Sequence, residues 1–183
     1  AAGAAAAGGV VLGRLVSGRT VAVTAGLVFA VLPRVTWAGM ETRSYALSMA
    51  AAVWLTVFCI RAARRGRPWW WLVYAVLLTG AAVLNVFLIL IVPAHAVAVL
   101  AYARQPRSFA YWATATAVAA AAVTPFILFT QTQLFQVQWI SPLGSATVTG
   151  ILHEQYFDQS VAAAVVAGII LVAAMICGPL FGA

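Results

Sequence analysis

PWWWLVYAVLLTGAAVLNVFLILIVPAHAVAVLAY, residues 68–102, runs without a charged side chain between two groups of arginines. As one helix this stretch would be about 50 Å long, whereas the hydrocarbon core of a bilayer is about 30 Å thick. We therefore predict two short helices that fold back near residues 79–85 and bring both ends of the stretch to one membrane surface. This hairpin decides the fold, because it sets the direction of the neighbouring segments.

The composition is that of an integral membrane protein. Of the 183 residues, 65% are hydrophobic and 7% are charged, whereas soluble domains carry about 25% charged residues. The net charge is +7, but the arginines flank apolar runs, so they indicate topology and lipid-headgroup contacts and argue against nucleic-acid binding. Cys59 and Cys177 lie inside apolar segments and are expected to be small buried residues without a disulfide.

The remaining apolar runs predict an all-α, polytopic membrane protein with about six transmembrane helices. Besides the two halves of the hairpin, spans are expected at residues 21–33, 45–60, 109–130 and 161–181. Residues 1–12 would be the end of an earlier helix. We expect residues 1–183 to form a single transmembrane domain, as a fragment of a longer chain, with an extracytoplasmic loop at residues 131–160.

The arginines predict the orientation of the chain. Positively charged residues in short loops stay in the cytoplasm, and the three arginine groups share one side only if residues 68–102 cross twice. The outer side then holds a loop at residues 34–44, the hairpin tip and the loop at 131–160. This places the candidate site on the outside of the cytoplasmic membrane. The three groups are Arg14 and Arg19; Arg61, Arg64, Arg65 and Arg67; and Arg104 and Arg107.

The first outer loop contains the most specific pattern, with Arg34, Glu41, Arg43 and Tyr45 leading into a span. A guanidinium group binds phosphate through two parallel hydrogen bonds, so Arg34 and Arg43 are candidates for phosphate binding. Glu41 would orient the arginines, and Tyr45 would support the site. The same residues also fit an ordinary loop ion pair, with Glu41 near a helix N-terminus where the helix dipole favours an anion.

Other polar candidates are spread along the chain. Asn85 at the hairpin tip could face the same cavity or cap a helix, and Gln138 could bind sugar hydroxyls. His153 and Glu154 suggest an acid or an acceptor-binding group, or else a solvated interfacial loop. His95 is either a hydrogen-bonded interior group or, as an ionisable residue within the membrane, a functional one. His153 and its neighbouring carboxylates are too sparse to predict a metal site.

The pattern of Glu41, Arg43 and Tyr45 opening a membrane helix resembles the second outer loop of the GT-C glycosyltransferases. The most similar branch contains protein O-mannosyltransferases and aminoarabinose transferases, which use polyprenyl-phosphate sugars. An arginine-rich turn, a broken hairpin and a glutamine-rich segment that includes Gln138 follow in the same order, so the resemblance covers roughly residues 14–157. It implies inverting transfer of a mannose-like sugar from a polyprenyl-phosphate donor to a glycan, lipid or protein acceptor, with a divalent metal as an optional cofactor.

Such a transfer needs a carboxylate base to activate the acceptor hydroxyl. In the family this base is an Asp in the first outer loop, and the resemblance implies that this loop precedes Ala1. Two other classes stay open: a transporter or flippase-like protein with a path through His95 and Asn85, gated by Glu41 and Arg43, and a non-catalytic membrane subunit. The inner halves of the predicted spans are expected to be nearly free of polar groups, which favours the transferase.

Overall fold

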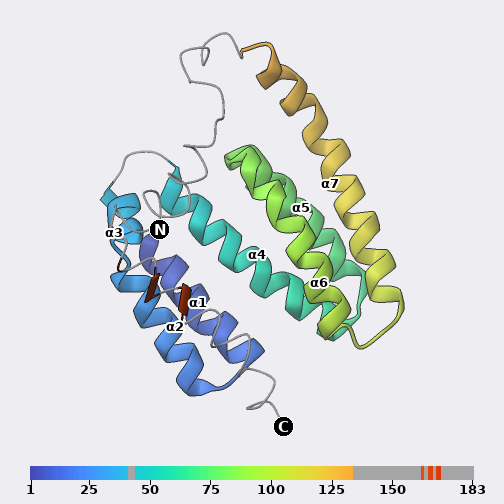
Figure 1. Ribbon diagram of the computed structural model, residues 1–183. Helices are drawn as coiled ribbons and strands as arrows, with labels where there is room; N and C mark the ends of the chain where they lie inside the picture. Colours follow the sequence, from blue (N-terminus) through green and yellow to red (C-terminus); the bar gives the residue numbers. More distant parts are fainter. Residues whose placement is uncertain (41–43, 134–161, 163–164, 167, 170–183) are drawn as a thin grey trace. The chain divides into compact units, whose positions relative to one another are not determined.

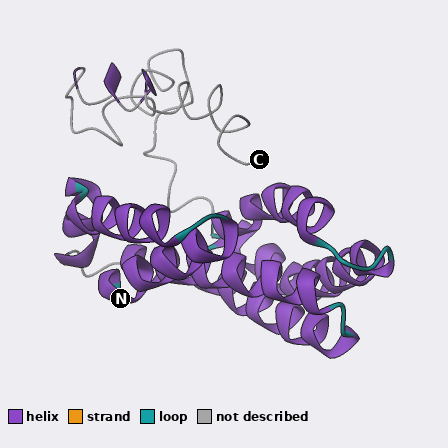
Figure 2. Cartoon of the chain, turned by 90° about the horizontal axis from the view of Figure 1, so that it is seen from below, coloured by secondary structure: helices purple, strands orange, loops and turns teal. Residues whose placement is uncertain are grey.

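The computed structural model describes residues 1–40 and 44–133, and five further residues, 162, 165–166 and 168–169. The chain divides into two compact units, Ala1–Val137 and Gln138–Ala183. Every element among the described residues is a helix, so the predicted all-α class is confirmed (Figure 2). The loop predicted at 131–160 and the span at 161–181 lie almost entirely outside the described residues, and the single domain stays a prediction.

The described part of the first unit consists of α-helices with one 3-10 segment (Figure 1). In chain order the elements are α1 (Ala2–Val16), α2 (Arg19–Val31), α3 (Pro33–Met40), α4 (Tyr45–Arg65), α5 (Pro68–Leu84), η1 (Val86–Ile91), α6 (Val92–Tyr102) and α7 (Arg107–Gln131). Gly66 ends α4 in the left-handed conformation, with φ 63°, and Pro68 starts α5. Glycine is favoured just after a helix and proline at its first position, so two residues suffice for this turn.

Two of the described helices, Tyr45–Arg65 and Arg107–Gln131, are long and apolar enough to cross a membrane. Shorter apolar helices accompany them at Ala2–Val16, Arg19–Ala30, Pro68–Leu84 and Val86–Tyr102. Contiguous exposed apolar surface is typical of contact with lipid. Large side chains that are more than half exposed cover the outer faces of α5, α6 and α7: Leu72, Val76, Val97, Leu100, Val118 and Leu128. The number of spans, about six, stays a prediction.

The predicted hairpin is present. The chain runs along α5 away from the arginine-rich turn at Gly66, turns at Asn85 and returns through η1 and α6 (Figure 1). The hydroxyl of Tyr74 in α5 lies 2.8 Å from Nδ1 of His95 in α6, and these two residues are about equally distant from the turn. Asn85 stabilises the turn, because its Oδ1 accepts the N–H of Phe87 at 3.1 Å.

The three arginine groups lie at one end of the first unit, which we call the arginine end. Nη2 of Arg64 donates to the Leu15 carbonyl in the last turn of α1, at 2.6 Å. The same guanidinium lies 4.9 Å from the ring centroid of Tyr102, the last residue of α6. The N–H of Arg104 points to the Ala63 carbonyl at 3.5 Å. The three groups therefore lie at the same end, as a hairpin at residues 68–102 requires. The membrane side that they face stays a prediction.

Close approach at Gly13 packs α1 against α2, and a hydrogen bond joins α1 to α4. A Cβ on Gly13 would lie 2.6 Å from the Cα of Ala22 in α2. Nε1 of Trp54 in α4 donates to the Ala4 carbonyl in α1 at 2.9 Å. Small residues permit such contacts between membrane helices. Residues 1–12, predicted as the end of an earlier helix, thus belong to a helix that continues to Val16 and packs within this unit.

The loop predicted at residues 34–44 is wrong in its first part, because Pro33–Met40 forms helix α3. Pro33 ends the preceding helix, as the sequence indicates, but it also starts the next one. Proline suits a first helical position, where its fixed φ is already helical and its missing N–H would have no partner. The predicted outer loop is therefore shorter than the sequence suggests, and residues 41–43 lie outside the described part.

Candidate functional site

The predicted site residues that the structure describes lie at the end opposite the arginine end. Arg34 is in the first turn of α3, Tyr45 begins α4, and Asn85 follows the last residue of α5. Of Arg34 only the backbone position is described. The other predicted site residues lie outside the described residues: Glu41, Arg43, Gln138, His153 and Glu154.

An aromatic pair joins α3, the helix that contains Arg34, to the start of α4. The rings of Trp37 in α3 and Tyr45 in α4 have centroids 5.7 Å apart and an interplanar angle of 30°. The two side chains are 38% and 37% exposed, respectively. The sequence predicts Tyr45 as a site residue but not Trp37. Residues 34–44 are expected to be a loop, and Trp37 reaches the ring of Tyr45 only because residues 33–40 form helix α3.

Asn85 connects the hairpin turn to the entrance of α4. Its Nδ2 donates to Oγ of Ser48 at 3.3 Å, and Ser48 lies about one helical turn after Tyr45. Its Oδ1 caps η1 through the N–H of Phe87. The capping alternative for Asn85 is therefore confirmed, and its contact with a substrate stays a prediction.

His95 is completely buried and is hydrogen-bonded through both ring nitrogens. Nδ1 lies 2.8 Å from the Tyr74 hydroxyl, and Nε2 lies 3.1 Å from Oγ1 of Thr56. The Thr56 hydroxyl also donates to the Ala52 carbonyl at 2.9 Å. A neutral imidazole has one N–H and one acceptor nitrogen, and a hydroxyl has one proton. Since the Thr56 hydroxyl donates to Ala52, it accepts from Nε2–H, and Nδ1 of the neutral ring accepts from Tyr74.

This network confirms that His95 is a hydrogen-bonded interior group. It joins three helices, since Thr56 lies in α4, Tyr74 in α5 and His95 in α6. Sequence reasoning missed Thr56 and Tyr74 because each stands in a different apolar run and helical periodicity cannot pair residues across runs. Buried polar residues within membrane proteins are usually paired with one another, which is the one signal that could have prompted a search for partners of His95.

Buried polar atoms continue from this network toward the arginine end. Trp112 and Thr116 of α7 lie beside the Tyr74 hydroxyl, in a geometry that falls short of a hydrogen bond. Among the described residues, four buried side-chain atoms lack a hydrogen-bond partner: Trp71 Nε1, Ser108 Oγ, Trp112 Nε1 and Thr116 Oγ1. The interior near the arginine end is therefore more polar than the sequence suggests, because indole and hydroxyl groups are inconspicuous in apolar runs.

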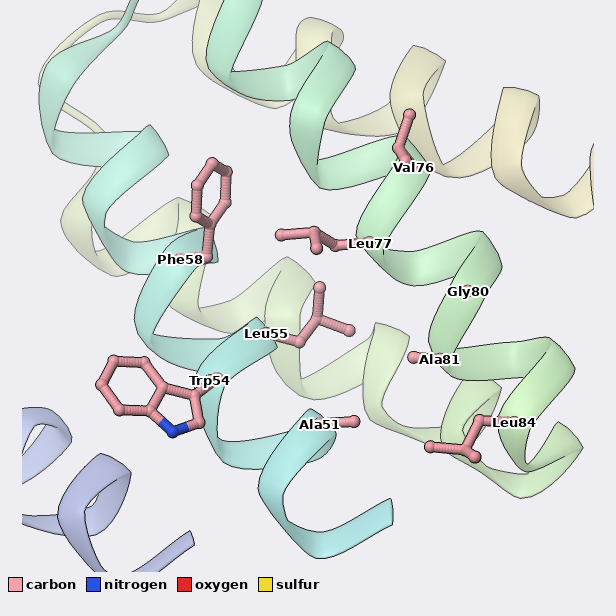
Figure 3. A pocket seen from close by; sticks show the side chains of 9 residues that line it. All are labelled: Ala51, Trp54, Leu55, Phe58, Val76, Leu77, Gly80, Ala81 and Leu84. Atoms are coloured by element: carbon pink, nitrogen blue, oxygen red, sulfur yellow. The ribbon is translucent and has the colours of Figure 1, made fainter. Parts of the chain in front are cut away.

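Two apolar hollows flank these contacts. A groove of about 440 Å³ lies between α4 and α5, where Leu55 and Leu77 point toward each other (Figure 3). A second hollow, of about 240 Å³, lies among α5, α6 with η1, and α7, and its polar wall groups are Thr116 and Thr124. In the described part of the chain, no cluster of three or more His, Cys, Asp or Glu side chains could hold a metal. The optional divalent metal stays a prediction.

Comparison with known proteins found no match for this chain among protein-family models, curated proteins or solved structures. The GT-C resemblance therefore depends on the residues of the sequence themselves.

Proposed function

We propose that the protein is the membrane part of a glycosyltransferase that moves a mannose-like sugar from a polyprenyl-phosphate donor to an acceptor outside the cytoplasmic membrane. The observation that carries the proposal is the separation of arginines along the helices. Arg64 joins the arginine groups at one end, whereas Arg34 and Tyr45 lie at the other. Positive residues in short loops favour the cytoplasm, so the end with α3 faces outside.

The proposed chemistry follows from the residues at the outer end. Arg34 and Arg43 bind the donor phosphate and stabilise the charge that grows on it as its bond to the sugar breaks. Glu41 orients these arginines. The attacking acceptor hydroxyl loses its proton to a carboxylate base, and the polyprenyl phosphate leaves with the bonding electrons. The exposed rings of Trp37 and Tyr45 offer an apolar face to the sugar.

The groove between α4 and α5 suits the lipid part of such a donor. It is lined by apolar and aromatic side chains, with Ala51 and Leu84 toward the outer end and Phe58 toward the arginine end (Figure 3). Ala51 lies about one turn beyond Ser48, which bonds Asn85. A polyprenyl chain in this groove would keep its phosphate near the entrance of α4.

A second candidate function is transport across the membrane. The buried network of Thr56, Tyr74 and His95 favours it, because a transport path requires polar groups in the membrane interior. Transport further requires that polar groups continue to both surfaces. The transferase is preferred because Arg34 and Tyr45, two residues of its candidate site, lie at the end opposite the arginine end. Absence of sugar transfer in the assay below would favour transport.

The test is transfer of radiolabelled mannose from polyprenyl-phosphate mannose in bacterial membranes that contain the full-length natural protein. Arg43→Ala is expected to reduce transfer about 100-fold, the loss typical of removing a group that stabilises transition-state charge. Arg107→Ala, at the arginine end, is the matched control and should retain activity. Membrane insertion should be unchanged in both. Equal transfer by the two variants, or no transfer by the natural protein, would overturn the proposal.

A further inference from the structure

A row of polar atoms follows the contact between α5 and α7, on the arginine-end side of His95. Ser108, Trp112 and Thr116 recur at intervals of four in α7 and therefore lie along one face of that helix. Trp71 contributes from the second turn of α5, and its ring packs edge-on against Tyr74, 5.8 Å away. Ser108, Trp71 and Trp112 are 0%, 2% and 7% exposed.

These groups do not satisfy one another in this structure, although the hydroxyl oxygens of Ser108 and Thr116 can accept from an indole N–H. The indole nitrogens of Trp71 and Trp112 only donate hydrogen bonds, so they cannot pair together. The hydroxyls of Ser108 and Thr116 are likewise without a partner. Native proteins supply partners for nearly all buried polar groups, and buried water commonly does so. Water accepts from an indole N–H and donates to a hydroxyl, so it fits this mixture of groups.

We propose that the contact between α5 and α7 binds a row of ordered water molecules from Ser108 to Thr116. At its inner end the row reaches the Tyr74 hydroxyl, beside which Trp112 and Thr116 lie. The Tyr74 hydroxyl in turn bonds His95. Water thereby connects the buried imidazole with the arginine end.

The row opens to the protein surface at the arginine end. Ser108 is the second residue of α7 and follows the exposed Arg107. A groove of about 380 Å³ lies along the same two helices near this end, with Pro68, Trp71, Tyr111 and Thr114 among its lining residues. The polar groups of the row are neutral N–H donors and hydroxyls, and no side chain between Ser108 and Thr116 is charged. These groups therefore favour water over an ion or a lipid phosphate.

The test is water-edited solid-state NMR on the full-length protein in lipid bilayers, with nitrogen-15 in the tryptophan and histidine side chains. Magnetisation from water is expected to reach the indole of Trp112 and the imidazole of His95 severalfold faster than the indole of Trp54. Trp54 is the matched control, because its indole bonds the Ala4 carbonyl away from this contact. Signals are assigned with Trp112→Phe, Trp54→Phe and His153→Asn.

The paired substitution Ser108→Ala and Thr116→Val removes the two hydroxyls that hold the water. It should slow the transfer to Trp112 and His95 severalfold and leave that to Trp54 unchanged. The wild-type measurement decides the proposal even if the variant does not fold. Transfer to Trp112 and His95 that is no faster than to Trp54 would overturn it. The outcome is independent of sugar transfer, so the proposed function and this inference can fail separately.

Discussion

The hydroxyl of Tyr74 donates to Nδ1 of His95 at 2.8 Å, and this bond joins the two halves of the hairpin formed by residues 68–102. Tyr74 is completely buried, as is His95, so loss of the bond leaves a buried ring nitrogen without a donor. The hairpin in turn places the arginine-rich turns at one end. This hydrogen bond therefore helps to stabilise the hairpin that brings the arginine groups to one end, and the predicted orientation depends on those groups.

Tyr74→Phe should lower the free energy of unfolding by about 1–3 kcal/mol, the cost of leaving a buried polar group unsatisfied. The measurement is thermal or denaturant-induced unfolding of the purified protein in detergent. Tyr111→Phe is the control, because Tyr111 is only partly buried, at the edge of α7. Equal stability of the two variants would show that the bond to His95 contributes little.

Gly13→Ala should destabilise the contact of α1 with α2, because the new Cβ would lie 2.6 Å from the Cα of Ala22. Gly9→Ala in the same helix is the control, since a Cβ there meets nothing within 4 Å. Alanine is favoured over glycine in a helix by up to about 1 kcal/mol. We therefore expect a lower melting temperature for Gly13→Ala and an equal or higher one for Gly9→Ala. Indistinguishable melting temperatures would argue against close packing of α1 on α2.

Arg64→Ala should lower the free energy of unfolding by about 1 kcal/mol, because Arg64 donates to the Leu15 carbonyl and covers the ring of Tyr102. Its partial exposure reduces the value of the charge. Arg61→Ala, an exposed site on the same helix, should change stability by less than half as much. The two variants are compared by the same unfolding assay, and a larger loss for Arg61→Ala would contradict the role given to Arg64.

The predicted orientation is tested by labelling single cysteines in intact bacterial cells with a membrane-impermeant maleimide. In a background with Cys59→Ala and Cys177→Ala, Met40→Cys should react from outside, because Met40 ends α3 and is 75% exposed. Ser17→Cys, in the turn at the arginine end, should react only after the cells are opened. Reaction of Ser17→Cys in intact cells would reverse the orientation and move the candidate site to the cytoplasm.

The hairpin could be predicted because it depends on quantities that the sequence contains, namely the length of residues 68–102 and the positions of the flanking arginines. The burial of Cys59 could be predicted for the same reason, since it stands within an apolar run. Helix α3 could not, because the signal at Pro33 is read equally as the end of one helix and as the start of the next.

The network around His95 could not be predicted, because Thr56, Tyr74 and His95 come from separate apolar runs. Their proximity depends on how α4, α5 and α6 pack, and helical periodicity gives only the face of each helix. Asn85 was a candidate from its place at the hairpin tip, but its bonds to Ser48 and Phe87 depend on the same packing. The predicted partners Glu41 and Arg43 lie outside the described residues.

The most direct test of the proposed function is photo-crosslinking of the full-length protein in membranes with a polyprenyl-phosphate mannose analogue that carries a diazirine near its phosphate. Mass spectrometry locates the modified peptides. The account predicts crosslinks within residues 33–48, at α3 and the start of α4, which are lost in Arg43→Ala and retained in Arg107→Ala. Crosslinks at the arginine end, or crosslinks that Arg43→Ala leaves unchanged, would contradict it.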